Sequence, residues 1–326
     1  MNLKEHIQTI YSLKDFKRKL SHIVLKFIYL FPLISKKYKK EQKETIKFIE
    51  QLNPQYIIQL NEGLGNQMFQ YAFAKSLEDK TKKKTLLNIN PFSKPYRLNG
   101  FKISLNKVTL DSNFTEFNHF EEKTLNYSED LINKEEKTYF KGYFQSYKYF
   151  DNIKEKLIED FKAKANFTDE YNKMENLIKN SESVLLNFRV GNDYKRLGWM
   201  LDYNYQIDAI IKIKELLPDK KLKFFIFADN IKKIKKEFKT NEDIVYVDLG
   251  KNNKDKVYLD LELMKKCKHS IIPNSSFSFW AAYLNENKNK IVIAPEPWFF
   301  TESDIIPNDW IKLNAKKIKT KNPRII

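Results

Sequence analysis

Side chains suited to holding an anion follow a predicted buried strand at residues 183–188. These are Asn187, Arg189, Gly191, Asn192 and Asp193. A guanidinium at the carboxyl end of a strand can donate two charge-assisted hydrogen bonds to a phosphate, and glycine lets backbone amides come close to an anion. A structural Arg paired with a nearby acid is the alternative. The segment predicts an anion site centred on Arg189, with Asp193 as a candidate base that accepts a hydroxyl proton.

Two further segments place small or polar residues at the ends of predicted strands. Asp229 follows one strand, and Asn274, Ser275, Ser276 and Phe277 lie where another strand turns into a helix. The free amides at a helix N-terminus, together with serine hydroxyls, form a phosphate site. Ordinary N-capping by Ser or Asn is the alternative. These residues are predicted to contribute to binding a phosphate group.

A third segment, Gly63, Gly65, Asn66 and Gln67, lies between a predicted strand and a helix in the first half of the chain. It is neither the six-residue dinucleotide fingerprint nor a Walker loop, because the required third glycine and the Gly-Lys-Ser/Thr are missing. A tight turn is the plain interpretation. Three such loops at strand ends nevertheless favour a shared ligand site.

No metal site or cofactor is predicted. Asp260-Leu-Glu262 comes nearest to the Asp-x-Asp of metal-dependent enzymes, but it lies inside a predicted amphipathic helix and is interpreted as solvent-facing charge. The single cysteine, Cys267, excludes an intrachain disulfide and a Cys-based zinc site, and it fits a reducing cytoplasm. Negative charge on a leaving group would then be met by Arg, Lys and backbone amides.

The elements that position these residues follow a regular order. Strands are predicted at 183–188, 223–228, 244–247, 270–273 and 290–294, and helices at 203–217, 231–238, 257–267 and 278–284. This alternation predicts an open parallel sheet covered on both faces, with ligands beyond the carboxyl ends of its strands. An earlier βα unit has strands at 56–60 and 84–89 around a helix at 66–77. Residues 189–194 are predicted to be a polar turn, and residues 92–150 show little periodicity.

The N-terminal 50 residues differ in character, with 12 Lys and Arg against five acids. Their apolar run at 22–34 is too short to span a bilayer. It is expected either to lie on an anionic membrane surface or to pack as a helix on the body. No secretory signal is evident, so the expected location is cytoplasmic, with peripheral contact at the inner face of the plasma membrane. The formal charge of +17 is compatible with a nucleic-acid partner. However, no nucleic-acid-binding motif is present, and most Lys residues lie on predicted polar helix faces, so no nucleic-acid partner is expected.

Several segments carry a specific series of motifs. Residues 62–72 read EGLGNQMFQYA, residues 142–150 read GYFQSYKYF, and residues 263–280 read LMKKCKHSIIPNSSFSFW. Ala294-Pro-x-x-Trp298 and Pro307-x-x-Trp310 follow. They resemble, in order from about 56 to 313, the motifs GGLGNQMFQYA, G-Y-x-Q-S-x-K-Y-F and L-M-S-x-C-K-H-x-I-I-A-N-S-S-F-S-W-W of the α-1,2-fucosyltransferases of glycosyltransferase family 11. With this resemblance, the residues predicted to hold a phosphate are expected to bind the sugar donor, and the loop at 63–67 is expected to close over the donor or the acceptor.

The resemblance implies an inverting transfer of L-fucose from GDP-fucose to O2 of a galactose-type acceptor, in bacterial surface-glycan or O-antigen assembly. It implies an α/β, GT-B-like fold of two Rossmann-type lobes with parallel sheets, and no essential metal. The domains expected are a basic helical extension at 1–53, an acceptor-side lobe at 54–180 and a GDP-fucose-binding lobe at 181–326.

One motif departs from the family. Its H-x-R-R-G-D-Y becomes Asn187-Phe-Arg-Val-Gly-Asn-Asp-Tyr194, so the first Arg is kept as Arg189 while Val190 replaces the second. The family's Asp aligns with Asp193 only through a one-residue insertion. This leaves open a different GDP-sugar or acceptor, or a catalytically inactive carbohydrate-binding relative.

Overall fold

The computed structural model describes residues 40–89, 95–110, 116–164, 166–249 and 256–317, and the chain divides into two compact units. One unit comprises residues 1–53 and 109–113, and the other the rest. Within the first, residues 40–52 form a helix, as predicted, and Gln42 donates a hydrogen bond of 3.0 Å to the Thr109 carbonyl. The apolar run at 22–34 lies outside the described residues.

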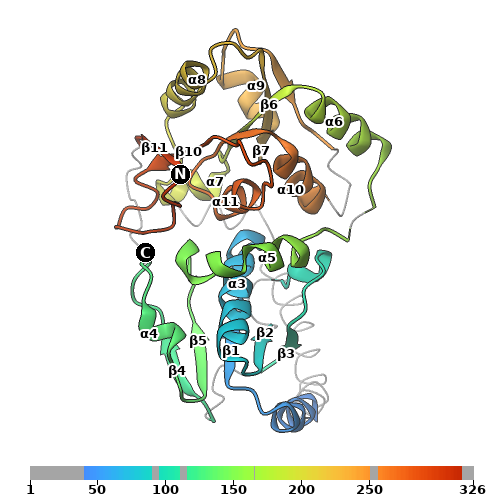
Figure 1. The fold of residues 1–326 in the computed structure, drawn as a ribbon, viewed down its shortest axis with the longest axis vertical. Helices are drawn as coiled ribbons and strands as arrows, with labels where there is room; N and C mark the ends of the chain where they lie inside the picture. The colour runs from blue at the N-terminus through green and yellow to red at the C-terminus, as the bar shows by residue number, and fades with distance from the viewer. Residues whose placement is uncertain (1–39, 90–94, 111–115, 165, 250–255, 318–326) are drawn as a thin grey trace, which may run out of the picture. The chain divides into compact units, whose positions relative to one another are not determined.

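The larger unit contains two parallel sheets (Figure 1), so the expected two-lobed, GT-B-like α/β fold is confirmed. In the described part of the first lobe, five strands lie in the order β3-β2-β1-β5-β4, and every pairing is parallel. Their bounds are Tyr56–Gln59 (β1), Thr85–Asn88 (β2), Asn106–Val108 (β3), Asn118–Glu121 (β4) and Thr138–Lys141 (β5). The predicted strands at 56–60 and 84–89 are confirmed as β1 and β2.

The strands β3, β4 and β5 were not predicted. The edge strands β3 and β4 expose most of their residues and give little hydrophobic signal, whereas β5 is buried but lies within an aromatic-rich stretch that hides its limits. Short helical segments complete this lobe. They are Leu98–Gly100 (η1), Glu129–Ile132 (α4), Tyr147–Tyr149 (η2), Asp151–Ile153 (η3) and Lys154–Asp160 (α5).

The second lobe confirms the predicted alternation. Its described strands lie in the order β11-β10-β9-β6-β7-β8, all parallel. Their bounds are Glu182–Phe188 (β6), Leu222–Ala228 (β7), Ile244–Tyr246 (β8), His269–Ile271 (β9), Val292–Glu296 (β10) and Ile311–Asn314 (β11). The helices around them are Asp169–Lys179 (α6), Asn204–Leu216 (α8), Ile231–Glu237 (α9), Lys256–Lys266 (α10) and Ser276–Tyr283 (α11).

Alternate residues of β6 serve the two faces of this sheet. Val184 and Leu186 belong to one buried cluster with α8, whereas Leu185 belongs to the other cluster with α10 and α11. A strand buried on both sides requires the continuous apolar run seen in the sequence. The sheet is therefore covered on both faces, which leaves its carboxyl edge for ligands.

Two predictions about local structure were wrong. The segment 189–194 is not all turn, because the helix α7 spans Asn192–Leu197 and ends at Gly198, whose φ is 73°. None of its residues is buried, so it carries no apolar periodicity. Glu262 is not solvent-facing. It is 8% exposed and accepts hydrogen bonds from the Ala163 amide at 3.0 Å and from Lys265 at 2.7 Å.

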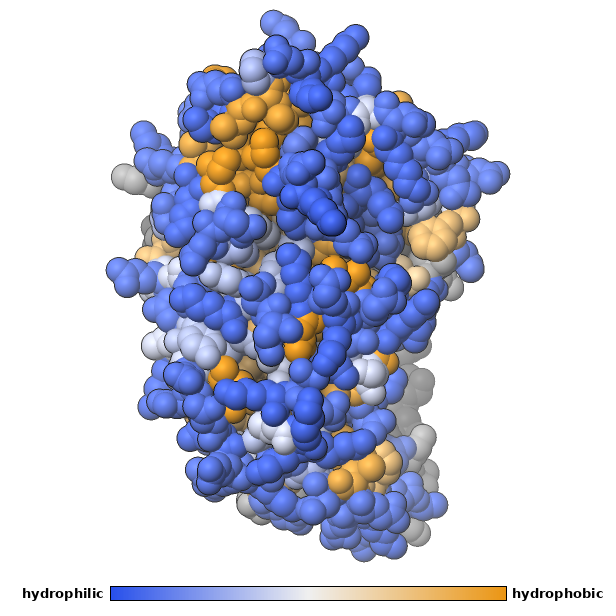
Figure 2. Space-filling view, in the orientation of Figure 1, coloured by the Kyte–Doolittle hydropathy of each residue, from blue (hydrophilic) through white to orange (hydrophobic). Residues whose placement is uncertain are grey.

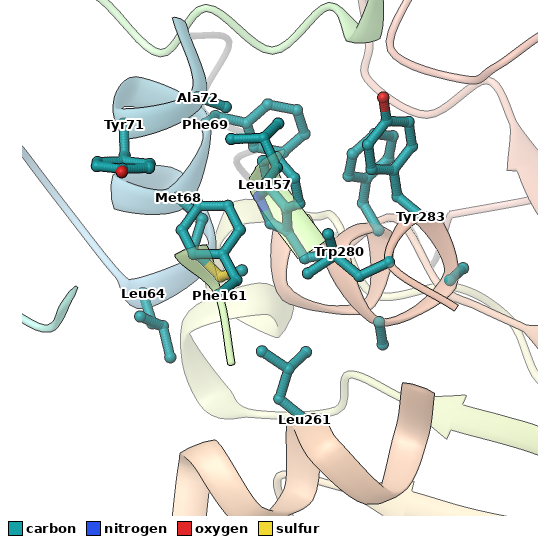
Figure 3. Packing of buried hydrophobic residues seen from close by; sticks show 14 of the residues in the cluster. Leu64, Met68, Phe69, Tyr71, Ala72, Leu157, Phe161, Leu261, Trp280 and Tyr283 are labelled. Atoms are coloured by element: carbon teal, nitrogen blue, oxygen red, sulfur yellow. The ribbon is translucent and has the colours of Figure 1, made fainter. Parts of the chain in front are cut away.

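The helix α3, Leu64–Thr81, begins inside the predicted glycine turn and connects the two lobes. Its Phe69 ring lies 4.7 Å from Phe279 and 4.9 Å from Trp280, both on α11. Figure 3 shows Phe69, Trp280 and Phe161 in the same buried cluster, and the Phe161 ring lies 5.1 Å from that of Trp280. The Trp280 indole donates a 3.0 Å hydrogen bond to the Gly65 carbonyl. The first turns of α3 and α11 therefore lie against each other.

The surface is mainly hydrophilic on the face seen in Figure 2. Its apolar area at the upper left lies where Figure 1 shows α8, whose Ile207, Ile211 and Leu216 are exposed. Among the described residues, no helix combines the length and the apolar character needed to cross a membrane.

Adding a methyl group at Gly65 should loosen this helix contact. A Cβ there would lie 2.5 Å from the Phe277 backbone nitrogen and 2.6 Å from the Ser276 carbonyl carbon, so backbone must move. We expect Gly65→Ala to lower the free energy of unfolding by about 1–3 kcal/mol. Gly63→Ala is the control, because a Cβ at Gly63 meets nothing within 4 Å and its φ is −77°. Equal urea midpoints for the two variants would contradict the packing argument.

Candidate functional site

Arg189 lies at the carboxyl edge of the second sheet, where β6 and β7 end side by side. Its guanidinium forms ion pairs with Asp229, which follows β7, and with Asp193, in the first turn of α7. It also lies over the Tyr194 ring, 4.5 Å from the centroid. Burial opposes its charge, but the neighbouring carboxylates raise the pKa of Arg189 above its usual value. The structure thus brings two predicted site residues, Asp193 and Asp229, against a third, the permanently charged Arg189.

Asp229 organises the loop after β6. Its carboxylate accepts hydrogen bonds from the amides of Val190 and Gly191, both at 2.9 Å. A Cβ at Gly191 would lie 2.7 Å from that carboxylate and 2.5 Å from the Asp193 carboxylate, so a side chain there would displace these carboxylate oxygens. The backbone amides predicted to meet a phosphate are therefore bound by the protein's own anion.

The two carboxylates hold Arg189 unequally. Asp229 binds the guanidinium and two amides, and its side chain is 23% exposed. Asp193 makes a single ion pair from a side chain that is 48% exposed. Asp193 is therefore the partner that an incoming anion displaces more easily. The side chain of Asn192 is exposed, and its role in donor binding stays a prediction.

The departures from the family motif have structural reasons. Val190 is 4% exposed and packs in the apolar cluster with Phe188, where an Arg would be buried. Asn187 donates to the Phe227 carbonyl at 3.1 Å and accepts from the Ser278 hydroxyl at 2.7 Å. The nitrogen of its side-chain amide thus bonds to β7 and the oxygen to α11. Ser278, which sequence reasoning did not single out, is the partner that gives Asn187 this role.

The first turn of α11 offers free amides beside these loops. Ser275 is the N-cap residue, yet its side chain makes no capping hydrogen bond. The amides of Ser276, Phe277 and Ser278 have no partner within the helix, as in any first helical turn. The N-capping alternative is therefore not realised here, and the amides suit an anion.

Asn274 ties three loops together. Its side-chain amide nitrogen donates to the backbone carbonyls of Trp199 and Trp298 at 3.1 and 3.3 Å. Its backbone carbonyl accepts from the Tyr194 hydroxyl at 3.1 Å. The Tyr194 ring also supports Arg189, so Tyr194 links the cation to α11. No sequence signal identified Tyr194 or Trp199 as partners of Asn274, because their contacts are long-range.

The loop at the start of α3 divides into exposed and structural residues. Gly63 is exposed, whereas Gly65 packs against Ser276 and Phe277. Gln67 is 1% exposed; its side chain donates to the Glu62 and Pro95 carbonyls and accepts from the Arg97 amide. The Asn66 side chain accepts from Gln145 at 2.8 Å. The predicted loop thus lies beside the α11 residues, although Gly65 and Gln67 serve packing.

Sequence reasoning missed a carboxylate at the carboxyl edge of the first sheet. Glu122, just after β4, accepts from the amides of Tyr143 and Phe144, the former at 2.7 Å. Burial raises its pKa. Phe144 has a φ of 52°, a conformation that this carboxylate supports. Because β4 has no clear hydrophobic pattern, the sequence did not show that Glu122 follows a strand.

Candidate metal ligands do not gather in the structure. Among the described residues, no group of three or more His, Cys, Asp or Glu has an arrangement suited to a metal ion. Cys267 is fully buried, and burial raises the pKa of its thiol well above the usual value.

Asp229 should be more important for the stability of its loop than Asp193. Asp229→Asn replaces an anion that accepts several bonds by a group with one acceptor oxygen, and we expect it to lower the free energy of unfolding by about 1–3 kcal/mol. Asp193→Asn removes one exposed ion pair and should change it by less than about 1 kcal/mol. Urea unfolding followed by circular dichroism compares the two. A larger loss in Asp193→Asn would reverse the assignment.

Comparison with known proteins gives consistent matches. The model of Glycosyl transferase family 11 matches residues 10–314. An α-1,2-colitosyltransferase of Escherichia coli is 31% identical over 296 residues, covering 79% of this chain and 98% of that protein. The O-antigen biosynthesis glycosyltransferase WbnK of Escherichia coli is 27% identical over 307 residues, covering 78% and 99%. The crystal structure of the fucosyltransferase NodZ from Bradyrhizobium matches with a TM-score of 0.47 and 15% identity, covering 70% and 92%. With a family match across nearly its whole length, this chain belongs to glycosyltransferase family 11.

Proposed function

We propose that this glycosyltransferase transfers L-fucose, or a closely related 6-deoxy sugar, from its GDP-linked donor to O2 of a galactose-type acceptor during O-antigen assembly. The family membership and the names of the two Escherichia coli relatives support this proposal. Colitose is fucose without the 3-hydroxyl, so the two candidate sugars differ by one group. An inactive carbohydrate-binding protein would bind sugars without releasing GDP.

The observation that carries the proposal is the position of Arg189. Its guanidinium lies beyond the carboxyl ends of β6 and β7, and Tyr194 connects it to Asn274, which immediately precedes the uncapped start of α11. In open parallel sheets this edge is where ligands bind. We assign Arg189 and the amides of Ser276 and Phe277 to the diphosphate of the donor.

In the proposed reaction the acceptor oxygen attacks the anomeric carbon while the bond to the β-phosphate oxygen breaks. Electrons pass to the phosphate, and Arg189 and the helix amides stabilise the negative charge that develops there. The diphosphate would replace Asp193 at the guanidinium, while Asp229 keeps its place on the loop. The carboxylate of Asp193, once released, would accept the proton of the attacking hydroxyl.

We further propose that turnover requires no metal ion, because a fixed cation and amides are present to receive the charge. The acceptor is proposed to bind at the first lobe, near Gly63 and Asn66. A cytoplasmic location at the inner face of the plasma membrane is proposed from the basic N-terminal 50 residues and the single cysteine.

Replacing Arg189 tests the anion site directly. We expect Arg189→Ala to lower kcat about 100-fold or more, because a transition-state charge partner is lost. The control is Arg196→Ala, which removes an exposed Arg from α7, the short helix that follows Arg189. The measurement is GDP release from GDP-fucose with a galactoside present. A rate for Arg189→Ala within a few-fold of wild type, with its circular dichroism unchanged, would refute the assignment.

A donor and chelator assay tests the reaction itself. We expect transfer from GDP-fucose or GDP-colitose to exceed transfer from GDP-mannose, and we expect EDTA to leave the rate unchanged within about 2-fold, because protein groups stabilise the leaving group. Linkage analysis of the product should show a bond to O2 of galactose. Loss of activity in EDTA that Mg²⁺ restores would contradict the proposed mechanism, and transfer only from GDP-mannose would contradict the proposed donor.

A further inference from the structure

Two buried polar atoms near Arg189 have no hydrogen-bond partner among the described residues. They are the side-chain oxygen of Asn274, a residue only 5% exposed, and the indole nitrogen of Trp199. Buried polar groups in folded proteins are almost always paired, and leaving one unpaired is unfavourable. An unpaired acceptor and an unpaired donor at the ligand edge of a sheet therefore need an explanation.

The orientation of the Asn274 amide is fixed by its neighbours. Its nitrogen faces two backbone carbonyls, those of Trp199 and Trp298, at 3.1 and 3.3 Å. A rotated amide would set its oxygen against both carbonyls, which accept but cannot donate. The unpaired atom is therefore the oxygen, and it requires a donor.

The Trp199 indole is held in the same cluster. Its ring packs edge-on against Tyr194, with centroids 5.7 Å apart, and against Phe299 at 6.5 Å. The Tyr194 hydroxyl donates to the backbone carbonyl of Asn274 at 3.1 Å, so the ring that packs against Trp199 is also bonded to Asn274. The other buried unpaired side-chain atoms of the described residues belong to Ser146, Gln206 and Ser270, outside this cluster.

A hydroxyl group is chemically suited to both kinds of atom, because it can donate to an amide oxygen and accept from an indole N–H. A phosphate oxygen would only accept, and the Asn274 oxygen would repel it. We propose that Asn274 and Trp199 form a subsite for a sugar hydroxyl of the nucleotide-sugar donor, an inference that rests on the proposed function. The Arg189 guanidinium lies over the Tyr194 ring at 4.5 Å, so the subsite adjoins the proposed diphosphate position. The ribose and the transferred sugar are the hydroxyl-bearing groups that flank a diphosphate.

The test compares how much the loss of a single donor hydroxyl weakens binding when the Trp199 indole N–H is present and when it is absent. Dissociation constants are determined for GDP-fucose and for analogues that lack the 2-, 3- or 4-hydroxyl of fucose, or the 2′- or 3′-hydroxyl of ribose. In wild type we expect one deletion to weaken binding about 10-fold or more, because it leaves buried groups unpaired. In Trp199→Phe the same deletion should raise the dissociation constant by less than about 3-fold. Such a reduced effect would show that the deleted hydroxyl and the Trp199 indole N–H interact. Which analogue shows the coupling distinguishes ribose from the transferred sugar.

The control is Trp310→Phe, the same change in a buried Trp whose ring packs on Phe279 at 5.3 Å. It should leave the effect of every deletion as in wild type. If Trp199→Phe does not fold, NMR of the wild-type protein replaces it. The chain has four Trp, and the Trp199 indole proton should move downfield with GDP-fucose and not with the analogue that lacks the recognised hydroxyl.

Binding of GDP-fucose without any coupled deletion, or without a shift of the Trp199 indole resonance, would overturn this subsite and leave the proposed function standing. The two orphan atoms would then hold water. Absence of binding by GDP-fucose and every analogue would overturn the proposed donor together with the subsite.

Discussion

The carboxylate of Asp229 is the group on which the candidate site depends. It gathers two backbone amides and the Arg189 guanidinium around one anion, so that the loop after β6 is held in shape without a substrate. A cation fixed in this way needs little reorganisation when negative charge develops beside it. The arrangement separates two tasks, because Asp229 supports the loop while the exposed Asp193 remains exchangeable.

Parallel sheets explain why residues from distant parts of the sequence meet here. The loops after β6, β7, β9 and β10 all leave the same edge of the sheet, and Asn274 binds two of them through backbone carbonyls. Aromatic rings fill the space between these loops, with Tyr194 in contact with both Arg189 and Trp199. The polar groups are thus set in an apolar surrounding, where each hydrogen bond is stronger and each unpaired atom more unfavourable.

Much of the second lobe could be predicted from sequence, because strands buried on both faces read as continuous apolar runs ended by polar residues. The positions of Arg189, Asp229 and Asn274 followed from those strand ends. Edge strands such as β4 and the helix α7, which has no buried residue, gave no such pattern, so Glu122 and the shape of residues 192–197 were missed. Hydrogen bonds between distant residues, such as Ser278 to Asn187, leave no local mark in sequence.

The close fit of Gly65 against Ser276 and Phe277 limits how the two lobes can move. The Trp280 indole is bonded to the Gly65 carbonyl, and the rings of Phe69, Phe150 and Phe279 pack around the same point. Interlocked side chains at a packed interface of this kind permit only small shifts of one helix against the other. Any closure of one lobe toward the other would therefore pivot about the crossing of α3 and α11, and atoms far from that crossing would travel farthest.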